Sequence, residues 1–232
     1  MFNSFKPGRF FPRLKKITQF IILKDDVRAG KTSSFIVKRG FDILLSMLIL
    51  VIVSLPLVLV MVLIKIDSPG AIFFRQTRIG LRGRPFELFK FRTMVANASS
   101  IQSSLEDMNE IEGGVLFKIK QDPRITRVGK FLRRYSIDEI PQLINVIKGD
   151  MSLVGPRPLT FRDVSKLPTN QLVRHWVLPG ITGLWQVSGR SETSSEFLGK
   201  CDRFYIQKWS LHLDLIILLK TLIVVIAGQG AY

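Results

Sequence analysis

The feature that most constrains the fold of this chain is a long apolar segment from Ile43 to Ile64. Within it, only Ser46, Ser54 and Pro56 interrupt the run of aliphatic and methionine side chains. As a straight helix the segment would extend about 33 Å, which is enough to cross the roughly 30 Å hydrocarbon core of a bilayer. Because such a helix has no polar face at all, we do not expect it to be a buried helix of a soluble protein. The segment therefore predicts a membrane helix.

Two features of this segment favour a helix that enters and leaves the membrane on the same side. Pro56 removes a backbone hydrogen bond and bends the helix, and Ser54 can satisfy a carbonyl freed nearby. Both flanks are basic: residues 1–40 carry ten Lys and Arg against two Asp, and residues 75–92 carry six Lys and Arg against one Glu. Since positive charge marks the cytoplasmic side, we expect a re-entrant helix. A spanning helix is the alternative.

The composition calls for an anionic partner. Lys and Arg number 34 against 18 Asp and Glu, a formal net charge of +16, which suits nucleic acid, anionic lipid headgroups or phosphorylated substrates. A single cysteine, Cys201, excludes an intramolecular disulfide and fits a reducing compartment. We expect a basic arm over 1–37, the membrane helix over 38–66 and one compact domain over 67–232. The arm binds the membrane surface or is a disordered tail.

Beyond the membrane segment the pattern predicts an α-rich α/β domain. Two strands, Ala71–Phe74 and Pro85–Arg92, flank a turn rich in Gly and Arg and form a hairpin. Helices are expected over 95–111, 127–134 and 141–147, and a mostly irregular segment over 155–195. Leu211–Ala227 is apolar but interrupted by charge, so it lies on the membrane interface or packs as a core helix. The aromatic side chains just before it suit the headgroup level; they are Phe204, Tyr205 and Trp209.

Two adjacent carboxylates, Asp138 and Glu139, stand where a short helix is expected to begin. With Asp138 as the N-cap, Pro141 falls at the third helical position, where its missing donor does no harm. The helix dipole and the neighbouring Arg133 and Arg134 should then lower the pKa of Asp138. An ionised carboxylate held in this way can attack phosphorus or hold a divalent metal. A purely structural helix cap is the alternative explanation.

Three basic residues are candidates for phosphate binding. Arg157 lies between two prolines, and a stiffly held guanidinium suits bidentate binding of a phosphate. Lys90 and Arg92 lie on one side of the second predicted strand and could add phosphate contacts. Each also has a structural explanation: a surface arginine in a stiff turn, or a strand face that meets solvent or lipid headgroups.

At these motifs the chain resembles a known family, the bacterial sugar transferases. They are monotopic phosphoglycosyl transferases that act on undecaprenyl phosphate. The resemblance covers about residues 36–232 and consists of long blocks in the family's order. The matching blocks are Lys38-Arg39, Lys90–Met94, Asp122–Gly129, Ser136–Leu143, Lys148–Pro158, Pro179–Arg190 and Gly230–Tyr232.

The resemblance implies a membrane-bound fold. Family members have a re-entrant helix-break-helix, a small α/β catalytic domain on the cytoplasmic face of the bacterial inner membrane, and amphipathic helices at the interface. In the family the break falls at a Ser-Pro pair, whereas Leu55 separates Ser54 from Pro56 here.

The resemblance also implies a mechanism. Asp138 and Glu139 match the family's catalytic pair, and Arg133 and Arg157 match positions that contact phosphate. By this resemblance Asp138 attacks the β-phosphate of a nucleotide diphosphate sugar, with Mg2+ assisting and Asp138 as its candidate ligand. UMP then leaves, and the lipid phosphate attacks the phosphosugar held on the enzyme. Glu139 tunes the pair or assists with protons and metal.

The expected partners are a UDP-sugar, undecaprenyl phosphate and membrane lipids, with no nucleic acid. The subtype resembled handles hexoses, so UDP-glucose or UDP-galactose is the expected donor, for exopolysaccharide, capsule or O-antigen synthesis. A homodimer stays open, since the sequence does not give the oligomeric state. Two other functions stay open: a non-catalytic membrane scaffold, and a membrane-tethered nucleic-acid-binding protein. The second suits the positive charge, but the carboxylate pair would repel a phosphate backbone.

Overall fold

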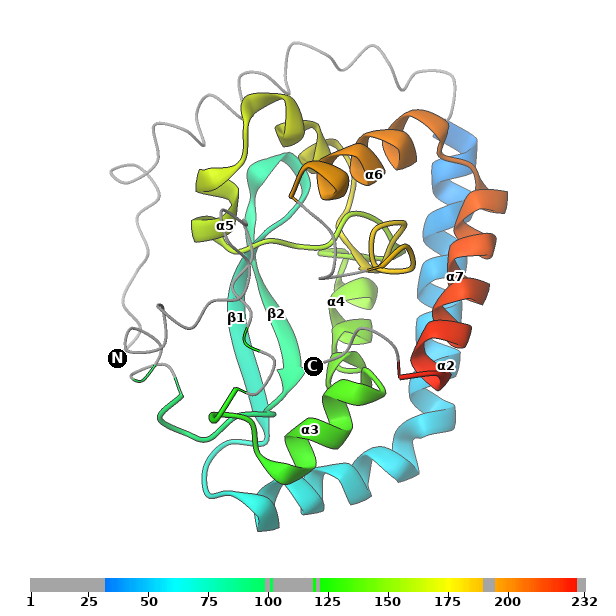
Figure 1. The fold of residues 1–232 in the computed structure, drawn as a ribbon. Helices are drawn as coiled ribbons and strands as arrows, with labels where there is room; N and C mark the ends of the chain where they lie inside the picture. The colour runs from blue at the N-terminus through cyan, green and yellow to red at the C-terminus, as the bar shows by residue number, and fades with distance from the viewer. Residues whose placement is uncertain (1–31, 99–100, 102–118, 120–121, 190–194, 229–232) are drawn as a thin grey trace.

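The computed structural model describes residues 32–98, 101, 119, 122–189 and 195–228. The basic arm up to residue 31 and most of the helix expected over 95–111 lie outside these residues. The described residues 96–98 form a turn rather than the start of that helix. The described part is rich in helices and contains two small sheets, in agreement with the predicted α-rich fold (Figure 1).

The apolar segment lies in one long helix, α2 (Thr32–Asp67), which begins earlier than the expected boundary at residue 38. In the part of the chain that the structure describes, α2 is the one helix long and apolar enough to cross a membrane. Pro56 lies inside it, and Figure 1 shows α2 bending part-way along its length. Ser54 Oγ donates to the Val51 carbonyl at 2.8 Å, and not to the Ile52 carbonyl, whose usual donor Pro56 lacks.

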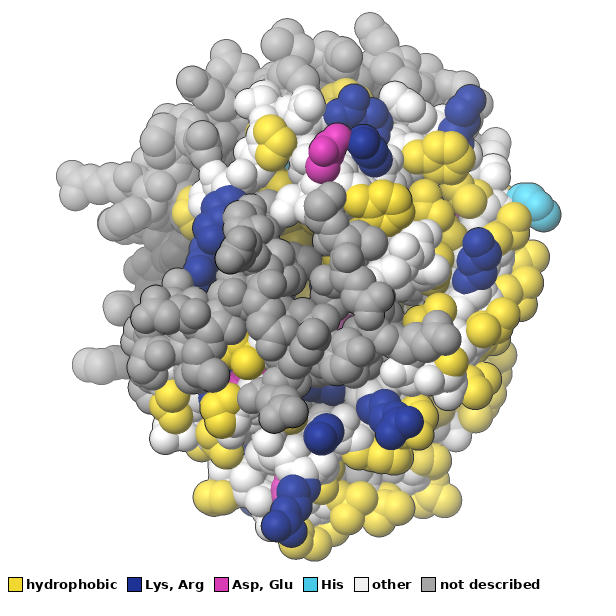
Figure 2. Space-filling model, viewed as in Figure 1, with side chains coloured by type: hydrophobic (Ala, Val, Ile, Leu, Met, Phe, Trp, Pro, Cys, Tyr) yellow, Lys and Arg dark blue, Asp and Glu magenta, His cyan; other side chains and the backbone are white. Residues whose placement is uncertain are grey.

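Much of the apolar surface of α2 is exposed, and so is a stripe along the last helix, α7 (Leu211–Ile226). Figure 2 shows hydrophobic side chains gathered along the edge of the molecule where α7 and α2 lie in Figure 1. The exposed large side chains of α7 are Leu211, Leu215, Leu219, Leu222, Ile223 and Ile226. Apolar surface of this extent fits association with a membrane.

The predicted hairpin is confirmed. β1 (Phe73–Ile79) pairs antiparallel with β2 (Pro85–Phe91), and Phe73 lies opposite Phe91. The first strand is longer than expected and runs into the short turn η2 (Leu81–Gly83).

Three short elements follow the hairpin. Helix α3 (Arg127–Arg134) has the predicted bounds, and Thr126 caps it by accepting a hydrogen bond from the Gly129 amide. The 3₁₀ turn η4 (Ile137–Glu139) comes next, followed by helix α4 (Gln142–Lys148). Both α4 and η4 contact β2, and α4 also packs on α2. The hairpin and α2 therefore support the turn that contains the two adjacent carboxylates.

The segment 155–195 is more regular than the mostly irregular chain predicted. It contains α5 (Phe161–Lys166), η5 (Thr169–Trp176) and β4 (Gly180–Thr182), and β4 pairs in parallel with β3 (Ser152–Val154). Thr160 and Asp163 form a capping box that starts α5. Local caps and a two-strand pairing thus order a sequence that its Gly and Pro content made look irregular. Helix α6 (Ser195–Lys208) leads to α7.

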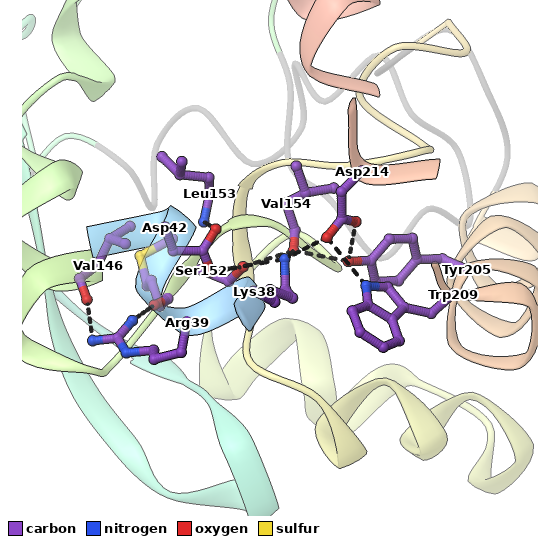
Figure 3. Close-up of polar contacts among 11 residues, drawn as sticks. Lys38, Arg39, Asp42, Val146, Ser152, Leu153, Val154, Tyr205, Trp209 and Asp214 are labelled. Atoms are coloured by element: carbon purple, nitrogen blue, oxygen red, sulfur yellow. Dashed lines mark hydrogen bonds and ion pairs between the residues drawn. The ribbon is translucent and has the colours of Figure 1, made fainter. Parts of the chain in front are cut away.

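A buried polar cluster joins the beginning of α2 to the end of the domain (Figure 3). Lys38 Nζ donates to Asp214 Oδ2 at 2.6 Å, and Asp214 also accepts hydrogen bonds from Tyr205 Oη at 2.8 Å and Trp209 Nε1 at 3.1 Å. Tyr205 and Trp209 are both buried in the domain. Their predicted place at the headgroup level was wrong, and of the three aromatic residues only Phe204 is exposed.

Both ends of α2 are bonded to the same domain. Near the beginning, Arg39 Nη2 donates to the Val146 carbonyl at 2.6 Å, at the end of α4 (Figure 3). At the other end, Asp67 Oδ2 accepts a hydrogen bond from the Val128 amide of α3 at 3.0 Å. The domain thus holds the long helix at its two ends.

Candidate active site

Three separate segments bring charged side chains to one place. Turn η4 supplies Asp138 and Glu139, the carboxylate pair; β2 supplies Lys90; and the loop after β3 supplies Arg157. Lys90 Nζ lies 2.6 Å from Glu139 Oε1 and 3.5 Å from Asp138 Oδ2. Arg157 Nη1 lies 3.5 Å from the same Glu139 oxygen. Four of the candidate residues named from the sequence are therefore together in the fold.

The backbone at the carboxylate pair differs from the prediction. Asp138 is not a helix N-cap, because it lies inside the 3₁₀ turn and α4 begins only at Gln142, with Pro141 in the N-cap position. Ser136 adopts a left-handed conformation with φ 53° and ψ 22°, which is uncommon for a residue other than glycine. Its side chain makes no capping hydrogen bond to η4. Ser136 thus precedes a 3₁₀ turn that contains Asp138, in place of the predicted helix start at Asp138.

Burial dominates the electrostatics of Asp138, which is only 6% exposed. Desolvation raises the pKa of this carboxyl group; Lys90 lowers it most among the neighbours, while Glu139 raises it further. Arg133 and Arg157 also act to lower it. The prediction of a lowered pKa was therefore wrong, because the sequence shows neighbouring charges and does not show burial.

Arg133 stands at the end of α3 on the Asp138 side of the pair. Its Nε donates to Thr93 Oγ1 at 2.8 Å, which fixes the guanidinium. Burial lowers the pKa of Arg133, and Asp138 is the strongest of the charges that oppose this. Arg134, by contrast, is exposed and lies 5.7 Å from the centre of the Tyr135 ring.

Arg92 does not join the other candidates. Its guanidinium is buried against the end of α2, where Nη2 donates to the Ser68 carbonyl at 2.6 Å and Nη1 to the Pro69 carbonyl at 2.9 Å. Arg92 comes just after the last residue of β2, and its side chain turns to the end of α2 rather than to the carboxylate pair. These contacts explain Arg92 as a residue that fixes α2, and they do not support the predicted phosphate contact.

The loop that presents Arg157 is tightly held. The Gly155 amide donates to the Thr182 carbonyl at 2.9 Å, and the Gly180 amide donates to the Pro156 carbonyl at 3.0 Å. A Cβ atom on Gly180 would collide with the Gly155 backbone, so this close approach needs glycine. The loop is thus fastened to β4, and Arg157 projects from a rigid base.

One residue beside the site was missed from the sequence. Arg78 of β1 lies close enough to Glu139 and Arg157 for both charges to act on it. Strand alternation could have suggested this residue, because Arg78 lies two residues after Gln76 on the same polar face of β1, next to the turn.

Comparison with known proteins places the chain in a family. Residues 33–228 match the model of the bacterial sugar transferases. The chain belongs to the bacterial sugar transferase family. Because the match includes the carboxylate pair and its surrounding cations, the geometry described above is that of a bacterial sugar transferase.

Several relatives of this sugar transferase have names that state an activity. It is 41% identical over 220 residues to "Galactosyl transferase CpsE" of Streptococcus agalactiae, covering 94% of this chain and 49% of the relative. It is 40% identical over 217 residues to "Undecaprenyl-phosphate galactose phosphotransferase" of Salmonella typhimurium, covering 92% of this chain and 45% of the relative. The chain thus spans about half the length of these relatives. It spans 98% of "Exopolysaccharide production protein ExoY" of Sinorhizobium fredii, at 40% identity over 221 residues and 94% of this chain.

The side chains at the site can be compared with the ligands that Mg2+ prefers. The described residues contain no group of three or more His, Cys, Asp or Glu side chains that could hold a metal ion. Asp138 and Glu139 nevertheless supply two adjacent carboxylates, and Mg2+ in phosphate chemistry commonly takes one or two carboxylates together with substrate phosphates and water. The carboxylate pair fits a magnesium ion that is shared with a phosphorylated substrate.

Proposed function

We propose that this sugar transferase moves a sugar 1-phosphate from a UDP-sugar to undecaprenyl phosphate and releases UMP. The observation that carries the proposal is a buried carboxylate, Asp138, surrounded by Lys90, Arg133 and Arg157 in a domain fastened to an apolar helix. Cations around a carboxylate suit a phosphate substrate, and a membrane helix suits a lipid substrate. The name of the Salmonella typhimurium relative states such an activity for that protein.

The first step forms a bond between Asp138 and the substrate. A carboxylate oxygen of ionised Asp138 attacks the β-phosphorus of the UDP-sugar, the bond from that phosphorus to the bridging oxygen breaks, and UMP leaves with the bond's electron pair. A sugar phosphate then remains attached to Asp138 as an acyl phosphate. Lys90 and Arg157 oppose the charge that gathers on the phosphoryl oxygens.

The second step frees the enzyme. An oxygen of undecaprenyl phosphate attacks the same phosphorus, the bond to Asp138 breaks, and the carboxylate leaves in its original form. The product is undecaprenyl diphosphate sugar, so every atom of the sugar phosphate ends on the lipid. Arg133, held by Thr93, lies on the Asp138 side and is suited to bind the incoming phosphate.

Asp138 and Glu139 are the residues that would hold Mg2+ together with the substrate phosphates. When bound there, the ion supplies positive charge that offsets the repulsion between a carboxylate and a diphosphate. Without relying on it, Lys90 already lies between the two carboxylates and Arg157 lies beside Glu139. Burial raises the pKa of Asp138, and these cations oppose that rise and so favour the ionised carboxylate.

The topology proposed for α2 is re-entrant, with the domain on the cytoplasmic face of the inner membrane. Arg39 at one end of α2 and Asp67 at the other both bond to the domain. A helix that crossed the bilayer once would have its two ends on opposite sides. The bend of α2 with Pro56 inside it supports the same arrangement.

For the donor we propose UDP-galactose or UDP-glucose, in exopolysaccharide synthesis. The Salmonella typhimurium relative is named for galactose, and an Escherichia coli relative, 38% identical over 205 residues, is named "UDP-glucose:undecaprenyl-phosphate glucose-1-phosphate transferase". The Sinorhizobium fredii relative is named for exopolysaccharide production.

The test is an assay of UMP release. The purified protein in nanodiscs is incubated with undecaprenyl phosphate, Mg2+ and a panel of UDP-hexoses and UDP-N-acetylhexosamines, alongside Asp138→Asn and the control Glu87→Gln. Glu87 is an exposed carboxylate of β2 that pairs with Arg75 at 3.8 Å. We expect UMP from UDP-galactose or UDP-glucose, lost in Asp138→Asn and kept in the control. UMP release that survives Asp138→Asn contradicts the proposal.

A further inference from the structure

Arg78 is a half-buried cation without a carboxylate partner in the described part of the chain. Its Nη2 donates to Gln76 Oε1 at 2.6 Å and its Nη1 to the Pro158 carbonyl at 3.2 Å. Both acceptors are neutral, and no carboxylate oxygen of the described residues lies within 4.0 Å of its guanidinium. Its Nε is buried and has no acceptor among those residues. The part of this cation that is removed from water favours an anion that compensates its charge.

The charges around Arg78 point toward the carboxylate pair. Burial, followed by the like charge of Arg157, lowers the pKa of Arg78 to about 10, while Asp163 and Glu139 oppose this. The guanidinium therefore stays charged at neutral pH. Asp163 is already engaged, because its side chain caps α5 by accepting from the Thr160 amide at 3.1 Å. Two arginines, Arg78 and Arg157, thus add positive charge on the Glu139 side of the site.

A buried arginine nearby provides a contrast. Arg174 of η5 donates to the Arg157 carbonyl at 2.6 Å, much as Arg78 donates to the next carbonyl, that of Pro158. Arg174, however, has a carboxylate partner, Asp202, at 3.3 Å. Among the residues that the structure describes, Arg78 shares its lack of a carboxylate partner with Arg92, but Arg92 lies against the end of α2, whereas Arg78 lies beside Arg157 and Glu139 of the site.

We infer that Arg78 is a further phosphate-binding residue, which together with Arg157 takes the diphosphate group of the nucleotide sugar. The inference rests on the proposed function and adds a residue to the same site. The reason is charge: a diphosphate brings two adjacent anionic groups, and two adjacent guanidiniums match them better than one. A lipid phosphate has the same chemistry with one group, so the experiment must separate the two substrates.

The first measurement is binding of inorganic pyrophosphate, which needs no turnover. Full-length protein in nanodiscs is titrated by calorimetry as wild type, Arg78→Met, Arg78→Lys and the control Arg75→Met. Arg75 is on the same strand, but its side chain is 64% exposed and pairs with Glu87. We expect Arg78→Met to bind pyrophosphate about tenfold more weakly or worse, Arg78→Lys to recover part of the loss, and the control to bind within threefold of wild type.

The second measurement separates the substrates by their kinetics. Arg78→Met should raise the KM for the UDP-sugar about tenfold and leave the KM for undecaprenyl phosphate within threefold. A rise confined to the KM for undecaprenyl phosphate overturns the inference. So does unchanged pyrophosphate binding in a folded Arg78→Met protein, even if UMP is released. If pyrophosphate binding depends on Arg78 but the protein releases no UMP, the proposed function is contradicted while the anion site at Arg78 is supported.

A third measurement decides the matter should Arg78→Met fail to fold. Wild-type protein is treated with phenylglyoxal, which modifies arginine, with and without pyrophosphate, and the modified peptides are mapped. We expect pyrophosphate to slow modification of Arg78 and Arg157 and to leave Arg75 and Arg84 unaffected. Equal modification of Arg78 with and without pyrophosphate overturns the inference, whatever the variants do.

Discussion

The ammonium group of Lys90 lies 2.6 Å from the carboxylate oxygen Oε1 of Glu139. The same nitrogen is 3.5 Å from Asp138 Oδ2, so one lysine of β2 serves both carboxylates of η4. Lys90 is the largest influence that lowers the pKa of Asp138, and Glu139 is the charge that raises it. Removing the charge of Lys90 should therefore raise the pKa of Asp138, and removing the charge of Glu139 should lower it.

Lys90→Met should move the acid side of the pH–rate profile to higher pH. Without the lysine the pKa of Asp138 rises further, so less of it is ionised at a given pH. UMP release at neutral pH should fall about a hundredfold. The control is Lys148→Met, since Lys148 lies at the exposed end of α4, 4.7 Å from the centre of the Phe89 ring. An acid limb that does not move in Lys90→Met contradicts this electrostatic role.

Glu139→Gln should move the acid limb the other way. The amide can still accept the hydrogen bond from Lys90, but it has no charge, so the pKa of Asp138 falls and ionisation is complete at lower pH. The measurement is the pH dependence of kcat/KM, with Glu87→Gln as the control on an exposed carboxylate. A limb that shifts upward would mean that Glu139 does not act on Asp138 through its charge.

The Arg92→Met variant should be less stable than wild type but should bind the UDP-sugar with unchanged affinity. The guanidinium of Arg92 donates to the carbonyls of Ser68 and Pro69, and these acceptors would lose a buried partner. We expect the free energy of unfolding to fall by about 2–5 kcal/mol, with an unchanged KM for the UDP-sugar at temperatures where the variant is folded. Arg157→Met should show the reverse pattern. A raised KM in a stable Arg92→Met protein would restore the phosphate contact predicted from the sequence.

Lys38 and Asp214 should be strongly coupled in stability. Their side chains are 12% and 6% exposed and 2.6 Å apart, and they join α2 to α7 (Figure 3). Lys38→Met leaves the Asp214 carboxylate with neutral donors only, and Asp214→Asn leaves Lys38 with Asp42 at 3.7 Å, so each change alone should cost up to about 3–5 kcal/mol. Chemical unfolding of both single variants and the double variant should show that the double variant loses much less than their sum. The exposed pair Glu196 and Lys200 should show no measurable coupling. Additive losses at Lys38 and Asp214 would contradict the pairing.

The sequence predicted those parts of the fold that local patterns determine. Alternation and a turn predicted the β1–β2 hairpin, and the helix expected over 127–134 has the bounds of α3. The membrane segment followed from its length and lack of a polar face, although α2 begins earlier than expected. Membership of the family followed from blocks of sequence that the comparison then matched.

The parts that failed depend on the environment of a residue. The predicted N-cap at Asp138 failed because Ser136 takes a left-handed conformation that its residue type does not indicate. The direction of the Asp138 pKa failed because burial outweighs the neighbouring cations. Arg92 was grouped with Lys90 because strand alternation was extended one residue beyond the end of β2. Tyr205 and Trp209 were assigned to the interface because the sequence does not reveal that Asp214 accepts hydrogen bonds from both.

The measurement that tests the central claim most directly is the trapping of a sugar phosphate on Asp138. The protein is incubated with UDP-galactose or UDP-glucose radiolabelled in the sugar, without lipid, then denatured, digested and mapped by mass spectrometry. We predict label on the peptide that contains Asp138, its absence in Asp138→Asn, and its transfer to undecaprenyl phosphate when that lipid is added before denaturation. Lipid-linked sugar formed at full rate with no label on the protein at any time would contradict the covalent mechanism.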